Sequence, residues 1–260
     1  MPSDGMMFTF VATIMRVLGI IPSRYNSSRF PGKPLIQLDG KSMIQRVYEQ
    51  ASSSQLDRVI VATDDARIYN HVIEFGGEAM MTSSDHETGT DRCVETYLSL
   101  EEEYDAVINI QGDEPVIRPG QLDLLAFCFN DDSCEIATLA VKVKDNDILF
   151  DSSKIKTVLD NNSNAIYFSR HPIPYQQRPA DQWLEHHTYY KHVGIYGFRS
   201  DILKELGKLP ASVLERAESL EQLRWLEHSY KIHVKITEFD SISIDIPKDV
   251  DRVLDILSRS

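Results

Sequence analysis

The chain has 260 residues and a mass of 29.7 kDa, a size that fits one large α/β domain with an inserted subdomain. Its residues are 42% hydrophobic and 26% charged, which excludes a disordered or fibrous protein. The formal net charge of -13 repels polyanions, so nucleic acids and acidic membrane surfaces are excluded as general partners.

Cysteine usage and the N-terminal sequence bear on the cellular compartment. The sequence has three cysteines, Cys93, Cys128 and Cys134. They are odd in number and lack CxxC spacing, so they predict neither a zinc site nor a disulfide framework. Residues 1–15 are partly apolar but lack a basic leader region and a cleavage site, and no stretch reaches the ~20 apolar residues of a membrane helix. We therefore predict a cytoplasmic protein with an N-terminal extension at 1–15, in which Met15 is an alternative start, and a single domain at 16–260.

In the first half, short β-branched runs alternate with amphipathic helical patterns, which is typical of βαβ units around a mostly parallel sheet. Strands are predicted at 17–21, 59–62 and 106–110. After the predicted cap Ser42, apolar residues fall at i, i+3, i+4 and i+7, namely Ile44, Val47, Tyr48 and Ala51. A second helix has its apolar face at Ile68, Tyr69, Val72 and Ile73 and ends at Gly76 and Gly77, and a third carries Val94, Tyr97 and Leu98. These patterns predict an α/β, Rossmann-like fold with a mostly parallel central sheet flanked by helices.

The second half is less regular. Strands are predicted at 136–143, 157–159, 193–198, 234–236 and 242–244, and helices at 220–226 and after Pro247. The segment from Ser169 to His187 is rich in Pro, Gln, Arg and aromatic residues, which suits an exposed arm better than a core. We therefore expect a smaller inserted lobe at about 165–200.

Polar residues follow three of the predicted strands. They are the loop after Ile21, the run Thr63-Asp64-Asp65, and the run from Gln111 to Glu114. In open parallel sheets, ligands bind beyond the carboxyl ends of the strands. These three segments are therefore the first candidates for a functional site.

The loop after the first strand carries an unusual charge. From Arg16 to Leu38 there are four cations and no carboxylate, in a protein of net charge -13. The loop is not a Walker P-loop, because Ser27 stands at the first glycine position and Pro34 follows the lysine. Its backbone can approach phosphate oxygens, and three side chains can neutralise them: Arg24, Arg29 and Lys33. The loop predicts a site for a nucleoside triphosphate, with a solvated basic surface loop as the alternative.

This loop and the run Gln111-Gly112-Asp113-Glu114-Pro115 closely resemble the sugar-activating nucleotidyltransferases, and within them the 3-deoxy-manno-octulosonate cytidylyltransferases. The resemblance extends, in order, over nearly the whole chain from Arg16 onward. It runs through His86 to Arg92, Tyr167 to Pro174, Lys191 to Gly197, Glu218 to Arg224 and Ile244 to Pro247. The basic loop is typical of the superfamily, and the later segments indicate the octulosonate branch.

The resemblance implies a reaction and a metal. CMP would pass from CTP to the anomeric hydroxyl of 3-deoxy-D-manno-octulosonate (Kdo), with release of pyrophosphate, and so activate Kdo for lipopolysaccharide synthesis. Asp113 and Asp245 would hold Mg²⁺, which prefers oxygen ligands. The alternatives are that Asp113 is a turn residue and that Asp245 caps the terminal helix. Arg24 and Lys33 would stabilise charge on the triphosphate, and Arg29 would help them or shape the loop.

Candidate binding residues complete the site. The nucleotide set is Ser23, Arg24, Arg29, Lys33, Gln111 and Gly112. The sugar set is His86, Arg92, His192, Tyr196, Glu221 and Gln222. Structural alternatives are loop-backbone contacts for Gln111, pairing of Arg92 with Asp91 or Glu95, a near-core role for His192 and a solvated helix face for Glu221. Glu87 and Thr88 depart from the family pattern, in which a less acidic residue and a serine are expected.

The segment with Arg170, Pro172 and Pro174 resembles the dimerisation arm of the family, so the resemblance implies a homodimer. Other functions stay open. The protein could act on another acidic sugar, such as a sialic acid or an amino-substituted Kdo, or use a different base. It could also be a nucleotide-binding regulatory protein that has lost catalysis, although the sequence retains Arg24, Lys33, Asp113 and Asp245, which speaks against this.

Overall fold

The structure is a computed structural model that describes residues 15–26 and 30–259. Its strands are β1 (Val17–Ser23), β2 (Gln37–Leu38), β3 (Lys41–Ser42), β4 (Arg58–Thr63), β5 (Ala79–Met81), β6 (Ala106–Asn109), β7 (Ile136–Lys142), β8 (Lys156–Leu159), β9 (Ala165–Ser169), β10 (Tyr190–Arg199) and β11 (Ile232–Ile236). Its α-helices are α1 (Met43–Ser52), α2 (Ala66–Glu74), α3 (Gly89–Leu98), α4 (Pro119–Phe127), α5 (Asn146–Phe150), α6 (Trp183–His186), α7 (Ser200–Leu206), α8 (Val213–Glu218), α9 (Gln222–Glu227) and α10 (Asp249–Leu257). Short 3₁₀ helices are η1 (Lys33–Leu35), η2 (Cys128–Asn130) and η3 (Ala180–Gln182). Of the predicted extension at 1–15, only Met15 lies within the described residues.

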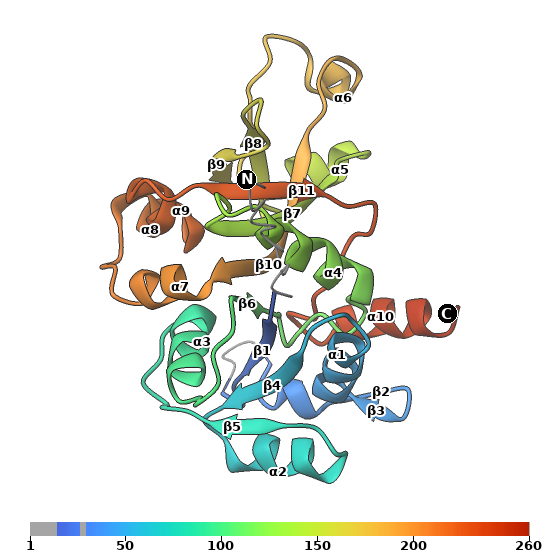
Figure 1. Cartoon of the computed structure of the whole chain (residues 1–260). Helices are drawn as coiled ribbons and strands as arrows, with labels where there is room; N and C mark the ends of the chain where they lie inside the picture. Colours follow the sequence, from blue (N-terminus) through green and yellow to red (C-terminus); the bar gives the residue numbers. More distant parts are fainter. Residues whose placement is uncertain (1–14, 27–29, 260) are drawn as a thin grey trace, which may run out of the picture.

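A mostly parallel sheet runs through the molecule (Figure 1). Its main path is β11-β7-β10-β6-β1-β4-β5. Strand β10 is antiparallel to β6 and β7, and the remaining neighbours along this path are parallel. The predicted fold class is confirmed.

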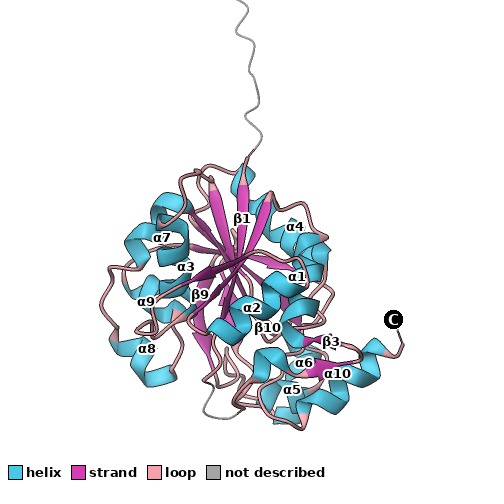
Figure 2. Cartoon of the chain, turned by 90° about the horizontal axis from the view of Figure 1, so that it is seen from below, coloured by secondary structure: helices cyan, strands magenta, loops and turns pink. Residues whose placement is uncertain are grey.

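Helices cover both faces of this sheet (Figure 2). Helices α1, α2 and α4 pack on one face, and α3, α7 and α9 pack on the other. Side chains of β1 alternate between the two faces: Val17 and Ile21 belong to the first core cluster, and Leu18 and Ile20 to the second. Because β1 is buried on both faces, its sequence is a continuous apolar run rather than an alternating one.

Two predicted helix ends are confirmed. The Ser42 hydroxyl accepts a hydrogen bond of 3.2 Å from the backbone N–H of Gln45 and so caps α1. Helix α2 ends before Gly76, whose φ of 84° lies in the left-handed region that glycine adopts without steric cost. Local sequence therefore sets these boundaries.

The predicted strand at 242–244 is wrong. Residues 241–245 have no regular structure, although Ile244 is buried in a cluster with Leu38, Met43 and Val253. The Ile244 backbone N–H donates a 2.9 Å hydrogen bond to the Asp113 carbonyl. A strand would instead form a series of backbone hydrogen bonds with a neighbouring strand. A buried extended segment has the same apolar sequence as a strand, so the pattern alone could not separate them.

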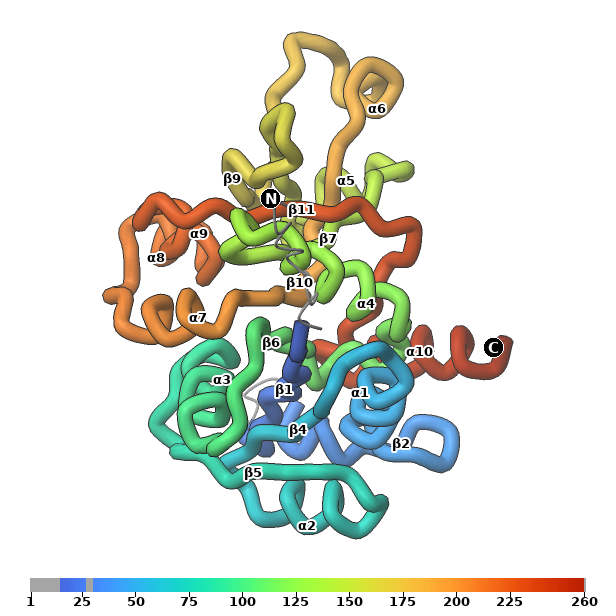
Figure 3. Tube along the Cα trace, in the orientation of Figure 1, coloured from blue at the N-terminus to red at the C-terminus, as the bar shows by residue number. Residues whose placement is uncertain are grey.

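The chain between β9 and β10 projects from the body of the molecule (Figure 3). It carries η3 and α6, and Trp183 packs there with Leu149 and Tyr189. The expected lobe at about 165–200 also includes β10, which lies within the main sheet. No helix in the described part of the chain is long and apolar enough to cross a membrane.

Candidate active site

A cavity of about 240 Å³ opens at the carboxyl ends of β1 and β6. Its walls come from three regions that are distant in sequence: residues 22–24 with 33–34, residues 86–89 with Arg92, and residues 111–113. Met43 and Asp245 complete it. Because β1 and β6 are parallel neighbours, the loops that follow them meet at one edge of the sheet, as the sequence predicted.

A cation and a carboxylate meet inside this cavity. The Lys33 Nζ atom lies 2.8 Å from the Asp113 Oδ2 atom, and their side chains are 13% and 28% exposed. Arg24 lines the same cavity from an exposed position. Partial burial strengthens such a pair, because little water screens it. The basic loop therefore brings positive charge directly against the carboxylate at the end of β6.

Asp245 joins Asp113 at this cavity through a backbone contact. The bond from the Ile244 N–H to the Asp113 carbonyl fixes the residue before Asp245 next to the turn that carries Asp113. The predicted alternative, in which Asp245 caps the terminal helix, is not what the structure has. Lys248 occupies the N-cap position of α10, and the Asp249 carboxylate accepts a 2.8 Å hydrogen bond from the Asp245 N–H.

The nucleotide candidates at the end of β6 also lie here. A Cβ atom on Gly112 would be 3.0 Å from the Pro22 carbonyl oxygen, so the two loops approach this closely only with glycine at 112. Gln111 and Ser23 line the cavity. Within the described residues the Gln111 amide makes no hydrogen bond to the loop backbone, and the buried Ser23 hydroxyl has no partner. Arg29, the remaining candidate, lies outside the described residues.

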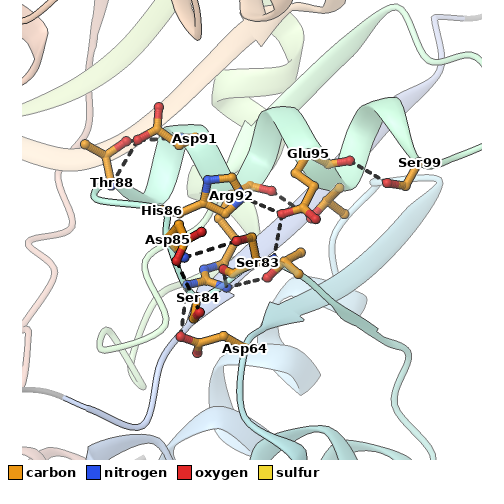
Figure 4. Close-up of polar contacts among 12 residues, drawn as sticks. Asp64, Ser83, Ser84, Asp85, His86, Thr88, Asp91, Arg92, Glu95 and Ser99 are labelled. Atoms are coloured by element: carbon orange, nitrogen blue, oxygen red, sulfur yellow. Dashed lines mark hydrogen bonds and ion pairs between the residues drawn. The ribbon is translucent and has the colours of Figure 1, made fainter.

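His86 and Arg92 lie in the same wall and are held by different carboxylates (Figure 4). His86 Nε2 contacts the Glu95 carboxylate, which also accepts a 2.8 Å bond from the Ser83 N–H. Arg92 Nη2 lies 3.5 Å from the carboxylate of Asp64. The alternative pairing of Arg92 with Asp91 or Glu95 is therefore wrong: the tertiary contact with Asp64 takes their place.

The N-terminus of α3 borders the cavity through Thr88 and Gly89. Thr88 caps this helix: its hydroxyl accepts a 3.1 Å bond from the Asp91 N–H, and the Asp91 carboxylate accepts one from the Thr88 N–H. Thr88, which stands where the family pattern has a serine, is thus the N-cap of α3. The positive end of a helix dipole favours anionic ligands at this wall.

The other sugar candidates lie outside the cavity wall, on β10 and at the start of α9. His192 Nε2 is 2.9 Å from the Thr138 hydroxyl, and burial, together with the neighbouring Lys191 charge, lowers the pKa of His192 to about 3. His192 thus lies near the core, as its structural alternative had it, and its contact with the sugar stays a prediction. The buried Tyr196 hydroxyl has no partner among the described residues.

Glu221 connects these residues to the cavity. Its Oε2 atom accepts a 3.1 Å hydrogen bond from the Thr90 hydroxyl on α3, two residues after Thr88. Burial raises the pKa of Glu221 to about 7, so Glu221 does not lie on the solvated helix face that was its structural alternative. Its neighbour Gln222 is buried. The two halves of the predicted sugar set thus meet around the first turn of α3.

Two buried polar residues beside the site were in neither of the predicted binding sets. Glu114 is 6% exposed, and burial, followed by the nearby Asp113 charge, raises the pKa of Glu114 to about 8. Asn109 faces Tyr196 across β6 and β10, and its Oδ1 atom has no partner within the described residues. Their position at the end of β6, next to Gln111 and Asp113, is the sequence signal that points to them.

Comparison with known proteins gives a consistent result. The chain matches the cytidylyltransferase family model over residues 18–235. It is 52% identical over 251 residues to the 3-deoxy-manno-octulosonate cytidylyltransferase of Parabacteroides distasonis, which covers 95% of this chain and 100% of that relative. The enzyme of the same name from Bacteroides thetaiotaomicron is 51% identical over 250 residues, 94% of this chain and 99% of that relative.

A solved structure is also similar over nearly the whole chain. It is described as CMP:2-keto-3-deoxy-manno-octonic acid synthetase complexed with CTP. It is 40% identical with a TM-score of 0.87, and the match covers 94% of this chain and 99% of that one. These similarities far exceed what shared fold alone requires. The chain belongs to the 3-deoxy-manno-octulosonate cytidylyltransferase family.

Proposed function

We propose that the protein transfers CMP from CTP to the anomeric hydroxyl of Kdo and releases pyrophosphate. The names of the relatives and the CTP complex of the similar structure support these substrates. The observation that carries the proposal is the single cavity in which Lys33 pairs with Asp113 beside Arg24 and Asp245. In this proposal the enzyme works in the cytoplasm, and its product supplies activated Kdo for lipopolysaccharide synthesis.

The basic residues would act on the triphosphate. In-line attack of the sugar hydroxyl on the α-phosphorus builds negative charge on the non-bridging oxygens and on the departing pyrophosphate. Arg24 and Lys33 would stabilise this charge, and Lys33 would exchange its contact with Asp113 for phosphate oxygens. The N-terminus of α3 adds N–H donors at the opposite wall.

The acidic residues suit a magnesium ion. Asp113 and Asp245 present carboxylates to one cavity, and Mg²⁺ is usually held by one or two carboxylates together with substrate phosphates. Within the described residues no group of three or more His, Cys, Asp or Glu side chains is arranged for a metal, so phosphate oxygens would supply further ligands. When bound, the ion would neutralise charge on the phosphates and the sugar carboxylate.

The sugar would occupy the buried polar layer around α3. Kdo carries one carboxylate and several hydroxyls, and Tyr196 and Asn109 present buried polar atoms that lack partners within the described structure. An unpaired buried polar atom is costly, so a polyhydroxy ligand that pairs with it gains affinity and selectivity. Arg92 in the adjoining wall would attract the sugar carboxylate, while Glu221 and Gln222 would pair with hydroxyls.

The projecting segment would form a homodimer. Tyr175 is 73% exposed in this segment and contacts the Trp183 ring edge to face, at 5.4 Å between centroids. Exposed aromatic side chains on a supported scaffold are typical of protein interfaces. Arg170 anchors the base of the segment by donating to the Glu218 and Ser219 carbonyl oxygens, at 2.8 Å and 3.2 Å.

A pyrophosphate-release assay tests the proposed function. Purified protein is supplied with CTP, UTP or GTP, each with Kdo, an amino-substituted Kdo or N-acetylneuraminate, in Mg²⁺ and in EDTA. Pyrophosphate is expected only with CTP and Kdo, and only with the divalent ion present. A preference for another base or another sugar would replace the proposed substrates. CTP binding without turnover in saturating Mg²⁺ would instead identify a regulatory nucleotide-binding protein.

A further inference from the structure

The strand end Thr63-Asp64-Asp65 was a candidate site in the sequence, yet no proposed substrate needs it. In the structure its two aspartates point to different partners. Asp64 pairs with Arg92 of the cavity wall. Asp65 caps α2 by accepting a 2.9 Å hydrogen bond from the Arg67 N–H, and its carboxylate also holds the Arg67 side chain. The ion pair between Asp65 and Arg67 connects α2 to the basic loop, because Arg67 also contacts Tyr25.

Arg67 is held in a fixed orientation. Its Nε and Nη2 atoms donate to the two Asp65 oxygens at 2.9 Å and 2.6 Å, a two-point contact that sets the guanidinium plane. The guanidinium carbon then lies 3.3 Å from the centroid of the Tyr25 ring. At this distance the Arg67 guanidinium stacks directly on the Tyr25 ring, so a cation–π contact joins α2 to the basic loop.

Tyr25 also takes part in the backbone hydrogen bond that closes the basic loop, which we call the Tyr25–Gly32 closure. Its carbonyl accepts a 2.9 Å hydrogen bond from the Gly32 N–H. Gly32 has a φ of 74°, and a Cβ atom there would be 3.0 Å from the Tyr25 hydroxyl oxygen. The two residues that flank this closure, Arg24 before Tyr25 and Lys33 after Gly32, both line the cavity. The closure therefore fixes the spacing of two cations that face the same cavity.

We propose that Arg67 is a positioning residue for the nucleotide: by stacking on Tyr25 it holds the Tyr25–Gly32 closure, and so sets Arg24 and Lys33 at the spacing that a triphosphate requires. The inference rests on the proposed function, in which CTP is the donor substrate. Arg67 itself is absent from the cavity wall, so it acts through Tyr25 rather than on the nucleotide.

Loss of this contact has a specific expected consequence. A loop without its support must be ordered when CTP binds, and the ordering lowers affinity. Removal of the stacking is expected to raise both the Kd and the KM for CTP about 2- to 5-fold, as the strength of an exposed cation–π contact implies. The KM for Kdo stays unchanged, because the sugar candidates lie on α3 or just before it, on β10 and at the start of α9. A residue that served only global stability would shift both KM values together.

The test is a double-mutant cycle with CTP binding measured by titration calorimetry and both KM values measured by pyrophosphate release. The variants are Arg67→Met, Tyr25→Leu and the combination, with Tyr25→Phe to keep the ring. Arg252→Met, at an exposed position on α10, is the matched control for loss of one surface arginine. Melting temperatures are recorded for all. Because Arg67 is exposed, Arg67→Met is expected to fold even if a Tyr25 variant does not.

The inference predicts weaker CTP binding for Arg67→Met and Tyr25→Leu, no further loss in the combination, and wild-type behaviour for Tyr25→Phe and Arg252→Met. Additive losses would overturn it, because they would mean that Arg67 acts as a general surface charge. Equal CTP affinity in Arg67→Met and the wild type would overturn it and leave the proposed function standing. A wild-type protein that binds no CTP would overturn the proposed function and the inference with it.

Discussion

At the scale of single residues, Asp113 has two partners of different kinds. Its carboxylate pairs with Lys33 Nζ at 2.8 Å, and its carbonyl accepts the bond from the Ile244 N–H. The backbone contact is independent of side-chain charge, so substitution of the carboxylate leaves the turn in place. This separation makes Asp113 a clean position at which to test the chemistry.

Asp113→Asn and Asp245→Asn are each expected to lower kcat at least ~10²–10³-fold, because each would remove a charged ligand of the proposed metal ion where negative charge develops. Folding should change little, since both amides are close in shape to the carboxylates. The measurement is steady-state pyrophosphate release at saturating CTP and Kdo over a Mg²⁺ series. Wild-type kcat in either variant would remove that residue from the proposed metal site.

Glu221 makes a prediction about pH. Its pKa is about 7 in the folded protein, raised by burial from 4.5. The folded state therefore binds this proton more tightly than the unfolded chain does. The contribution of this group to stability is fully present below about pH 4.5 and is lost as pH rises through about 7.

Glu221→Gln removes this titration. At about pH 8 the variant is expected to have a free energy of unfolding higher than the wild type by at most about 2–3 kcal/mol, and near pH 4.5 the difference should vanish. Urea unfolding at both pH values measures it. The proposed sugar role predicts a raised KM for Kdo in the same variant. If the free energies of unfolding of the two proteins change with pH in the same way, the raised pKa of the Glu221 carboxyl would be contradicted.

At the scale of elements, one buried ammonium supports the base of the projecting segment. Lys156 on β8 is fully buried, and its Nζ atom donates to the carbonyl oxygens of Asp151, Lys154 and Arg170 at 2.8 Å, 2.5 Å and 2.6 Å. Burial lowers the pKa of Lys156 to about 8, which leaves it charged at neutral pH. The loop before β8 and the residue after β9 thus share one donor group.

Lys156→Met is expected to lower the free energy of unfolding by about 3 kcal/mol, because the carbonyl oxygens lose their donor while staying buried. Thermal and urea unfolding measure this loss. Lys144→Met, at an exposed position after β7, is the matched control and should change stability by less than about 0.5 kcal/mol. An equal effect of the two substitutions would mean that the three contacts add nothing.

At the scale of the whole molecule, the net charge of -13 opposes formation of the proposed dimer. Two like-charged copies repel, so association needs an apolar contact that outweighs the repulsion. The projecting segment offers Tyr175 and the neighbouring strand β9 offers Ile166, with exposed fractions of 73% and 60%. These side chains are the apolar surface that we expect a second copy to cover.

Sedimentation is expected to give about twice the monomer mass of 29.7 kDa. The double substitution Tyr175→Ser and Ile166→Ser should raise the dimer dissociation constant at least about 10-fold, since two buried apolar side chains are lost. Leu98→Ser, which removes a 60% exposed leucine on α3, should leave it unchanged. A monomeric wild type at micromolar concentration would contradict the dimer.

The sequence by itself determined the fold class and most strands of the sheet. Strands β1 and β4 are buried on both faces and therefore have continuous apolar sequences. The cap at Ser42 is a local hydrogen bond. Both features can be predicted without knowledge of tertiary contacts. Helix α4 escaped prediction because apolar residues lie on more than one of its faces. The segment at 242–244 was misassigned because burial, rather than strand pairing, explains its apolar sequence.

The sequence also identified most of the residues that line the candidate cavity, because cations without carboxylates in one loop and aspartates after apolar runs are local features of the chain. Only the tertiary structure decided the partners: Lys33 with Asp113, Arg92 with Asp64, and Arg67 with Tyr25. The physical reason is that pairing depends on distances between elements far apart in the chain. On α3 the nearest carboxylates in sequence are Asp91 and Glu95. Packing of α3 against the end of β4 instead brings Arg92 close to Asp64.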